Sequence, residues 1–267
     1  MARWHLSALL AICCAGATAS TAPAGPRTVN VASDFFTYHG RCSSKGPAER
    51  ARQWQVLLED RHPAFFSQVI YRNQQGKARE RYRAWCIERF WSDVAPRMAS
   101  IRRLGTGIER EIAAIVGRFQ KQFPDFRPTR TFYVTVSFSF RGKVAELDGK
   151  PVLALGLDQL TAGATQLRIT MAHELFHLYH FQTFSVKGGL YRSLWAEGLA
   201  TYVSAMIVPG HRFSAYLGFP GWKMNRCEKL LARMAAELKQ QLGSIDQRIK
   251  RIYFGAEPRG GTARGPW

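Results

Sequence analysis

Two histidines four residues apart are the part of this sequence with the clearest chemical pattern. They lie in MAHELFHLYH (171–180), where His173 and His177 are separated by one helical turn. On a helix the two side chains project from the same face, so both imidazoles can bind one metal ion. Glu174 lies about 100° round the helix, where it can reach a water on the metal without being a ligand itself. We expect a zinc site at which Glu174 is the general base.

A catalytic zinc site needs a third protein ligand and one open position. SLWAEGLATYVS (193–204) has a helical pattern and places Glu197 twenty residues after His177. The intervening segment KGGLYRS contains the glycines that a chain reversal needs. We therefore predict that His173, His177 and Glu197 bind Zn²⁺, with the third ligand on a following helix.

The pattern HELFH followed by WAEGLATY resembles the gluzincin metallopeptidases, the thermolysin-like group, and most closely the peptidase-MA-like subset. The resemblance covers about residues 130–208. It implies an α+β, zincin-like fold, in which a helical N-terminal region precedes a small β-sheet with an edge hairpin and two ligand-bearing helices. It also implies that His173, His177 and Glu197 are zinc ligands and that Glu174 is the general base.

Two positions depart from the thermolysin pattern. That pattern has an Asp four residues after the third ligand to orient the first histidine, whereas this chain has Thr201. The His or Tyr that stabilises the oxyanion has no direct match. His211, Tyr202 and Tyr216 are the candidates, and each is equally compatible with packing or with a surface position. For His180, which follows His177 by three residues, we favour a structural or ligand-orienting role.

Several segments around the motif must position these side chains. TFYVTVSFSF (131–140) alternates β-branched and aromatic residues with smaller ones and predicts a strand. RGKVAELDGKPVLALGLD predicts a hairpin that turns at Asp148-Gly149. The edge strand near 143–157 could hold an extended peptide by strand addition. Helical periodicity covers 165–182, 193–208 and 226–251.

The chain divides by pattern into five segments. Residues 1–19 are expected to be a signal peptide and 20–46 an extended N-terminal segment. A helical region follows at 47–125, with an apolar stripe at Ile108, Ile112, Ile115 and Phe119. The metallopeptidase domain spans 126–255, and a Gly/Pro/Arg-rich tail occupies 256–267.

The first segment predicts export. A short basic start leads into an apolar run that is too short to span a bilayer, and Ala17-Thr18-Ala19 fits the small-residue rule for cleavage near Ala19. No other stretch is apolar enough to cross a membrane. We therefore expect a secreted or periplasmic protein. Cleavage leaves Cys42, Cys86 and Cys227, which allow one disulfide in any of three pairings.

The net charge of +19 raises nucleic acid and anionic membranes as partners. No zinc-finger spacing, aromatic RNA-binding strand motif or helix-turn-helix pattern accompanies it, so we do not expect nucleic acid. The leading interpretation is an exported zinc metallopeptidase that acts on a peptide or protein substrate, with a surface charge suited to an anionic envelope. The alternatives are a zinc amidase acting on a cell-wall amide and a non-catalytic, basic envelope-binding protein that retains the fold.

Overall fold

The computed structural model describes residues 27–128, 131–160, 163–184, 188–246, 248–249 and 253. The expected signal peptide and the expected tail lie outside these residues. Within them the chain is an α+β protein with one mixed four-stranded sheet. The strands are β1 (Arg27–Asn30), β2 (Thr131–Thr135), β3 (Gly142–Leu147) and β4 (Lys150–Gly156).

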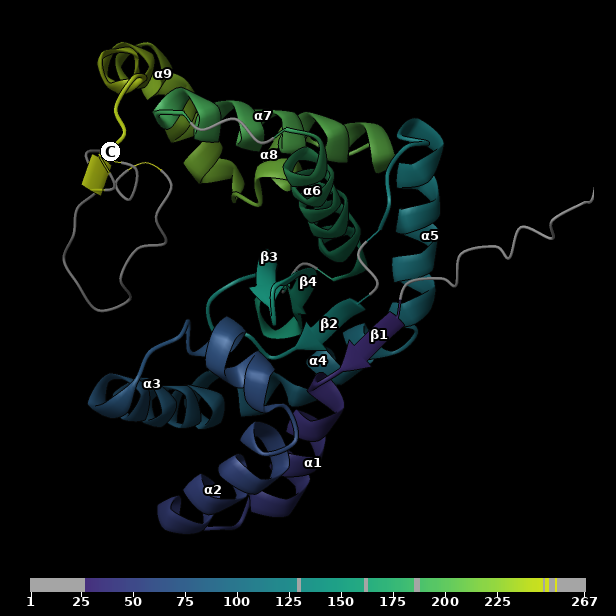
Figure 1. Ribbon diagram of the computed structural model, residues 1–267, viewed down its shortest axis with the longest axis vertical. Coiled ribbons are helices and arrows are strands. Elements are labelled where there is room, and N and C mark those ends of the chain that lie inside the picture. The colour runs from purple at the N-terminus through teal and green to yellow at the C-terminus, as the bar shows by residue number, and fades with distance from the viewer. Residues whose placement is uncertain are drawn as a thin grey trace, which may run out of the picture.

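The helices fall into two groups around this sheet (Figure 1). Those before the second strand are α1 (Ala32–Cys42), α2 (Pro47–Trp54), α3 (Gly76–Arg89), α4 (Met98–Gly105) and α5 (Ile108–Gln122), with short 3₁₀ and π segments at Gln55–Glu59, Phe65–Ile70, Phe90–Val94 and Ala95–Arg97. Those after the sheet are α6 (Ala164–Thr183), α7 (Leu190–Ile207), α8 (Phe213–Leu217) and α9 (Gly221–Gln241). Helices α1 to α4 lie on one side of the sheet, and α6 to α9 lie on the other (Figure 1).

The sheet has the order β1-β2-β4-β3. β1, β2 and β4 run parallel, and β3 runs antiparallel to β4. The hairpin predicted at Asp148-Gly149 is confirmed, and both turn residues have positive φ, as a tight primed turn requires. The edge strand predicted near 143–157 is only partly an edge. β4 pairs with β2 as well as with β3, so β3 alone is the edge strand on this side of the sheet.

The strand predicted for 131–140 ends early, at Thr135. The buried carboxylate of Asp158 accepts hydrogen bonds from the backbone N–H groups of Ser137 (2.7 Å) and Phe138 (3.0 Å). Phe138 consequently turns with φ +63° instead of continuing the ladder. This turn directs the chain into β3, the strand nearest the histidine helix.

The segment expected to be extended at 20–46 is extended only at its described start and is helical after that. Arg27–Asn30 form β1, which pairs with β2, and Ala32–Cys42 form α1. The helix forms because it buries Phe35 and Tyr38 against Trp54 and Phe90 in an aromatic cluster. This cluster belongs to one continuous core that also contains the apolar side of α6.

The later helices match the predicted periodicity with shifted ends. The segment 165–182 lies in α6 and 193–207 in α7, while α9 begins five residues before the predicted 226 and ends at Gln241. Cys42, Cys86 and Cys227 are free thiols, so the expected single disulfide is not formed. None of the helices that the structure describes has the length and apolarity needed to span a bilayer.

Replacing Asp158 with Ala should destabilise the fold. It leaves two buried N–H groups without their acceptor, at about 1–3 kcal/mol each. We expect the free energy of unfolding to fall by at least about 2 kcal/mol in urea titrations. The matched control is Asp60→Ala at an exposed position, where a change within about 0.5 kcal/mol is expected. Equal stability of the two variants would contradict this role for Asp158.

Candidate metal centre

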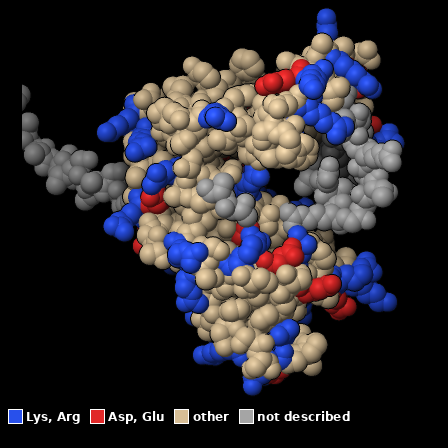
Figure 2. Space-filling model, turned by 180° about the vertical axis from the view of Figure 1, so that it is seen from behind, with Lys and Arg blue, Asp and Glu red and all other residues tan. Residues whose placement is uncertain are grey.

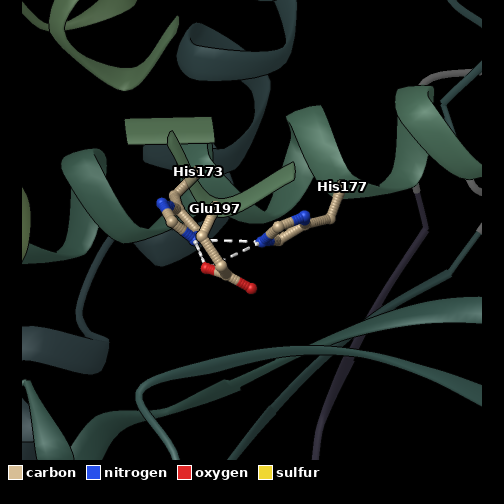
Figure 3. Close-up of side chains that lie close together, drawn as sticks. All are labelled: His173, His177 and Glu197. Carbon is tan, nitrogen blue, oxygen red and sulfur yellow. Dashed lines mark hydrogen bonds and ion pairs between the residues drawn. The ribbon is translucent and has the colours of Figure 1, made fainter. Parts of the chain in front are cut away.

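Helices α6 and α7 pack side by side and bring the predicted ligands together. α6 buries Leu167, Met171, Leu175 and Leu178 on its apolar side. This leaves His173 and His177 on a different side, one turn apart. Glu197 projects from α7 toward both imidazoles, and the three side chains point at one another (Figure 3).

The three donor atoms form a small triangle. The distances are 3.0 Å between the Nε2 atoms of His177 and His173, 3.2 Å from His173 Nε2 to Glu197 Oε2, and 3.5 Å from His177 Nε2 to Glu197 Oε2. Donors about 2.05 Å from one tetrahedral ion lie about 3.3 Å apart. The triangle therefore has the size that one zinc ion spans, and no other group of three such side chains converges this way within the described residues.

The chemistry of the donor set also fits zinc. Two imidazoles and one carboxylate form one of the three-ligand sets of catalytic zinc sites, which leave a fourth position open. Both histidines direct Nε2 into the triangle, and the Nδ1 atom of His177 is buried without a hydrogen-bond partner in the described structure. A partner on that nitrogen normally orients a ligand histidine.

Thr201 does not supply that partner. Its hydroxyl donates to the backbone carbonyl of Glu197 at 2.9 Å, one turn back along α7. In the thermolysin pattern the Asp at this position orients the first histidine, which would be His173 here, whereas Thr201 is bonded to its own helix. Within the described residues His177 is held by the interactions of its Nε2 atom with His173 and Glu197 and by packing. Ring contacts with His173 and Phe181 provide that packing.

The charges within the triangle stabilise one another. Burial opposes ionisation of Glu197, but hydrogen bonds from His173 and His177 hold the pKa of Glu197 far below its usual range. Burial likewise lowers the pKa of His177, yet the hydrogen bond and charge of Glu197 outweigh it and raise that pKa overall. The carboxylate is therefore ionised at neutral pH, as metal binding requires.

Glu174 lies next to the triangle and outside it. Burial raises the pKa of Glu174, while the charges of His173 and His177 and a hydrogen bond from the Val144 backbone oppose that rise. The Val144 contact ties the carboxyl group to the edge strand β3. Glu174 is thus a partly buried carboxyl group beside the ligands, with a pKa moved in the direction that favours a general base.

Gly142, at the start of β3, leaves room for the side chains of α6 that pack against this strand. A Cβ atom at this position would lie 2.5 Å from Cγ of Glu174 and 2.6 Å from Cγ2 of Thr170. Only glycine therefore allows α6 to approach the edge strand this closely. The sequence pattern did not indicate this role, because a glycine at a strand start has no distinctive spacing.

The oxyanion candidates lie on α7, on α8 and in the segment between these helices. The Tyr216 hydroxyl donates to the carbonyl of Val208 at 2.8 Å and accepts from the N–H of His211 at 3.2 Å, so it holds the segment between α7 and α8. Tyr202 is 65% exposed on α7. Within the described residues no hydrogen bond or ion pair joins Tyr202, Tyr216 or the His211 ring to His173, His177 or Glu197.

Two adjoining pockets open beside the ligands. One, of about 420 Å³, is lined by His177 and Glu197 together with Ser193. The other, of about 620 Å³, is mainly apolar and is lined by Trp195, Leu199 and Leu242, among others. His180 and Arg192 line both pockets, so they stand where the two meet. Burial and the nearby charge of Arg192 lower the pKa of His180, which favours its neutral form.

Comparisons with protein-family models, with curated proteins and with solved structures find no match for this chain.

We expect the protein to bind one zinc ion per chain and to lose affinity when Glu197 is replaced by Gln. Loss of a direct ligand should cost more than the roughly 10–100-fold that loss of a ligand-orienting partner costs. Competition with a chromophoric chelator measures the change. Affinity should also fall as the pH drops, because the imidazoles must be neutral to bind. The control Glu228→Gln, at an exposed position of α9, should bind zinc with the affinity of the parent. Undiminished zinc affinity in Glu197→Gln would exclude this ligand set.

Proposed function

We propose that this protein is an exported, zinc-dependent metallopeptidase of the gluzincin type. The observation that carries the proposal is the convergence of His173, His177 and Glu197 on one point, with the carboxyl group of Glu174 beside it. The HELFH and WAEGLATY motifs and their spacing support the same conclusion. The signal-type segment at residues 1–19 is the basis for proposing export.

The position of each residue determines the catalytic role that we propose for it. A zinc ion held by the three ligands supplies Lewis acidity, which acidifies water and polarises an amide carbonyl. Glu174 accepts the proton of the attacking water and delivers it to the amine that leaves. Its raised pKa suits both steps, because a carboxyl group closer to neutrality both accepts and releases a proton readily.

The free side of β3 is the proposed site for the peptide backbone. Glu146 pairs with Pro151 of β4, which has no N–H group, and the backbone of Val144 reaches Glu174 instead of β4. Alternate residues of β3 therefore turn their backbone groups away from the sheet. An extended substrate that pairs there lies next to Glu174, and recognition of its backbone needs no particular side chain.

The substitution Glu174→Gln should abolish hydrolysis and keep the metal. Glutamine has nearly the same shape but cannot accept the proton, so turnover of a peptide library should fall about 10²–10⁴-fold. Zinc content, measured by elemental analysis, should stay at one per chain because Glu174 is not a ligand. A variant that retains full activity would exclude this mechanism, and a parent protein that binds zinc but cleaves no peptide would favour a non-protein amide substrate or a binding role.

The substitution Gly142→Ala tests the packing of α6 against the edge strand. The added methyl group collides with Glu174 and Thr170, so we expect activity to fall at least about tenfold even though every ligand and the base remain. Gly117→Ala is the matched control, since a Cβ atom there meets no atom within 4 Å and alanine favours the middle of α5. Similar kinetics in the two variants would show that the close approach at Gly142 is not needed.

A further inference from the structure

The exposed apolar side chains are concentrated in one part of the molecule. Of the twelve large apolar residues that are exposed in the described structure, eleven lie between 181 and 245. The other is Val56. The helices from the end of α6 through α9 therefore present an apolar surface that the sheet and the N-terminal helices do not.

One side of α7 forms the centre of this surface, and we call it the α7 face. Its residues are exposed and follow helical spacing along the whole element: Tyr191, Leu194, Trp195, Tyr202 and Met206. The opposite side, with Ala200, Val203 and Ile207, is buried. The only charged residues of α7 are Arg192 and Glu197, and Glu197 points to the metal centre. A helix with apolar residues on two opposite sides is normally covered on both of them.

Helix α9 continues the α7 face and adds positive charge. None of its 21 residues is fully buried. Leu231, Met234 and Leu238 fall on one side of it at helical spacing. That side leads to Leu242, which lines the same pocket as Tyr191 and Trp195. Its cations outnumber its acids by five to two: Lys223, Arg226, Lys229, Arg233 and Lys239 against Glu228 and Glu237.

Backbone hydrogen bonds fix the end of α9 beside the start of α7. The N–H of Leu190 donates to the carbonyl of Ser244, and that of Tyr191 donates to the carbonyl of Leu242, both at 2.9 Å. In space-filling view the region of α7 and α8 is largely free of charged side chains, while Lys and Arg gather on α9 next to it (Figure 2). The end of α9, which carries the basic margin, is thus joined to the start of the α7 face.

We propose that the α7 face and α9 dock onto the surface of an anionic lipid bilayer. Tyr and Trp favour the interface between headgroups and hydrocarbon, and three of the five residues of the α7 face are of these types. An amphipathic helix with Lys and Arg on its polar side lies in the plane of an anionic membrane. A second copy of the chain fits less well, because each copy carries a net charge of +19.

Docking in this way holds the metal centre at the membrane. Glu197 and the α7 face belong to the same helix, so the site lies within about one helix diameter of the lipid surface. The substrates it favours are peptide segments at the membrane surface. This last step rests on the proposed function, whereas docking itself needs no hydrolysis and is tested without it.

The test is cosedimentation of the full chain with vesicles of phosphatidylglycerol and phosphatidylcholine in equal parts, and with vesicles of phosphatidylcholine alone. We expect binding to the anionic vesicles that weakens as salt is added. The triple variant Trp195→Ser, Tyr202→Ser, Leu231→Ser should bind them at least about tenfold more weakly, because these side chains are 63–65% exposed and would insert their apolar surface. The control Val56→Ser should bind like the parent.

A second pair of variants separates the surface from the overall charge. Lys223→Gln with Lys229→Gln should weaken binding about fivefold for each charge removed. Lys77→Gln with Arg81→Gln removes the same charge from exposed positions of α3, on the far side of the sheet, and should change binding much less. All variants carry the same residues 1–26, so any binding by that segment is common to them.

Three results would overturn the proposal. The first is no binding of the parent chain to anionic vesicles. The second is equal binding by the triple variant and the parent, which would separate binding from the α7 face. The third is a self-associated parent that the triple variant turns into a monomer without any loss of vesicle binding, which would make the face a contact between copies. Circular dichroism and melting temperature confirm that each variant is folded.

Discussion

The close approach of α6 to the edge strand on one side and to α7 on the other is the constraint on which the rest of the site depends. Gly142 leaves room for the side chains of Thr170 and Glu174, and the backbone of Val144 contacts the Glu174 carboxyl group. On its other flank α6 meets Glu197 through both histidines. One helix therefore sets the distances between the proposed ligands, the proposed base and the strand proposed to bind a peptide.

The elements around α6 hold it in this place. A bidentate ion pair between Arg168 and Glu111 joins α6 to α5. The Nε and Nη2 atoms of Arg168 each lie 2.7 Å from a carboxylate oxygen of Glu111, and this pairing keeps the pKa of Glu111 below its usual value. Because this carboxylate must ionise to pair, its contribution is present at neutral pH and is lost as the pH falls through the lowered pKa. The buried carboxylate of Asp158 binds the backbone N–H groups of the turn after β2, and this turn places Gly142 next to α6.

The large positive charge has more than one role in the structure. Part of it is structural: the buried carboxylate of Glu59 is paired with Arg83 and approached by Arg79, and the Tyr71 hydroxyl also donates to it. The guanidinium groups in that cluster satisfy a carboxylate that would otherwise be costly to bury. Another part lies on α9 beside a largely uncharged surface, where Arg233 pairs with Glu237 but the cations outnumber the acids by five to two. Net charge alone does not separate these roles, because it carries no information about which cations already have partners.

Local pattern determined the elements that carry the chemistry. The spacing of His173, Glu174 and His177 places them on one helix, and that spacing depends only on the 3.6-residue period. The same holds for the Asp148-Gly149 turn, whose backbone angles exclude most other residues. Strand length was overestimated after Thr135, since the acceptor that ends the strand is Asp158, more than twenty residues further along the chain.

Position in space was decided by the tertiary structure alone. Sequence spacing put Glu197 on a helix after His177, but only the packing of α7 on α6 brings its carboxylate within 3.2 Å of His173. Tertiary contacts also bond the Tyr216 hydroxyl to the carbonyl of Val208 and leave one side of α7 uncovered. The pairing of β4 with β2 makes β3 and not β4 the edge strand. The sequence by itself determined which residues share a helix or a turn, because those relations span a few residues. Which helices meet, and how closely, depends on contacts between distant segments and on the volume of single side chains such as Gly142.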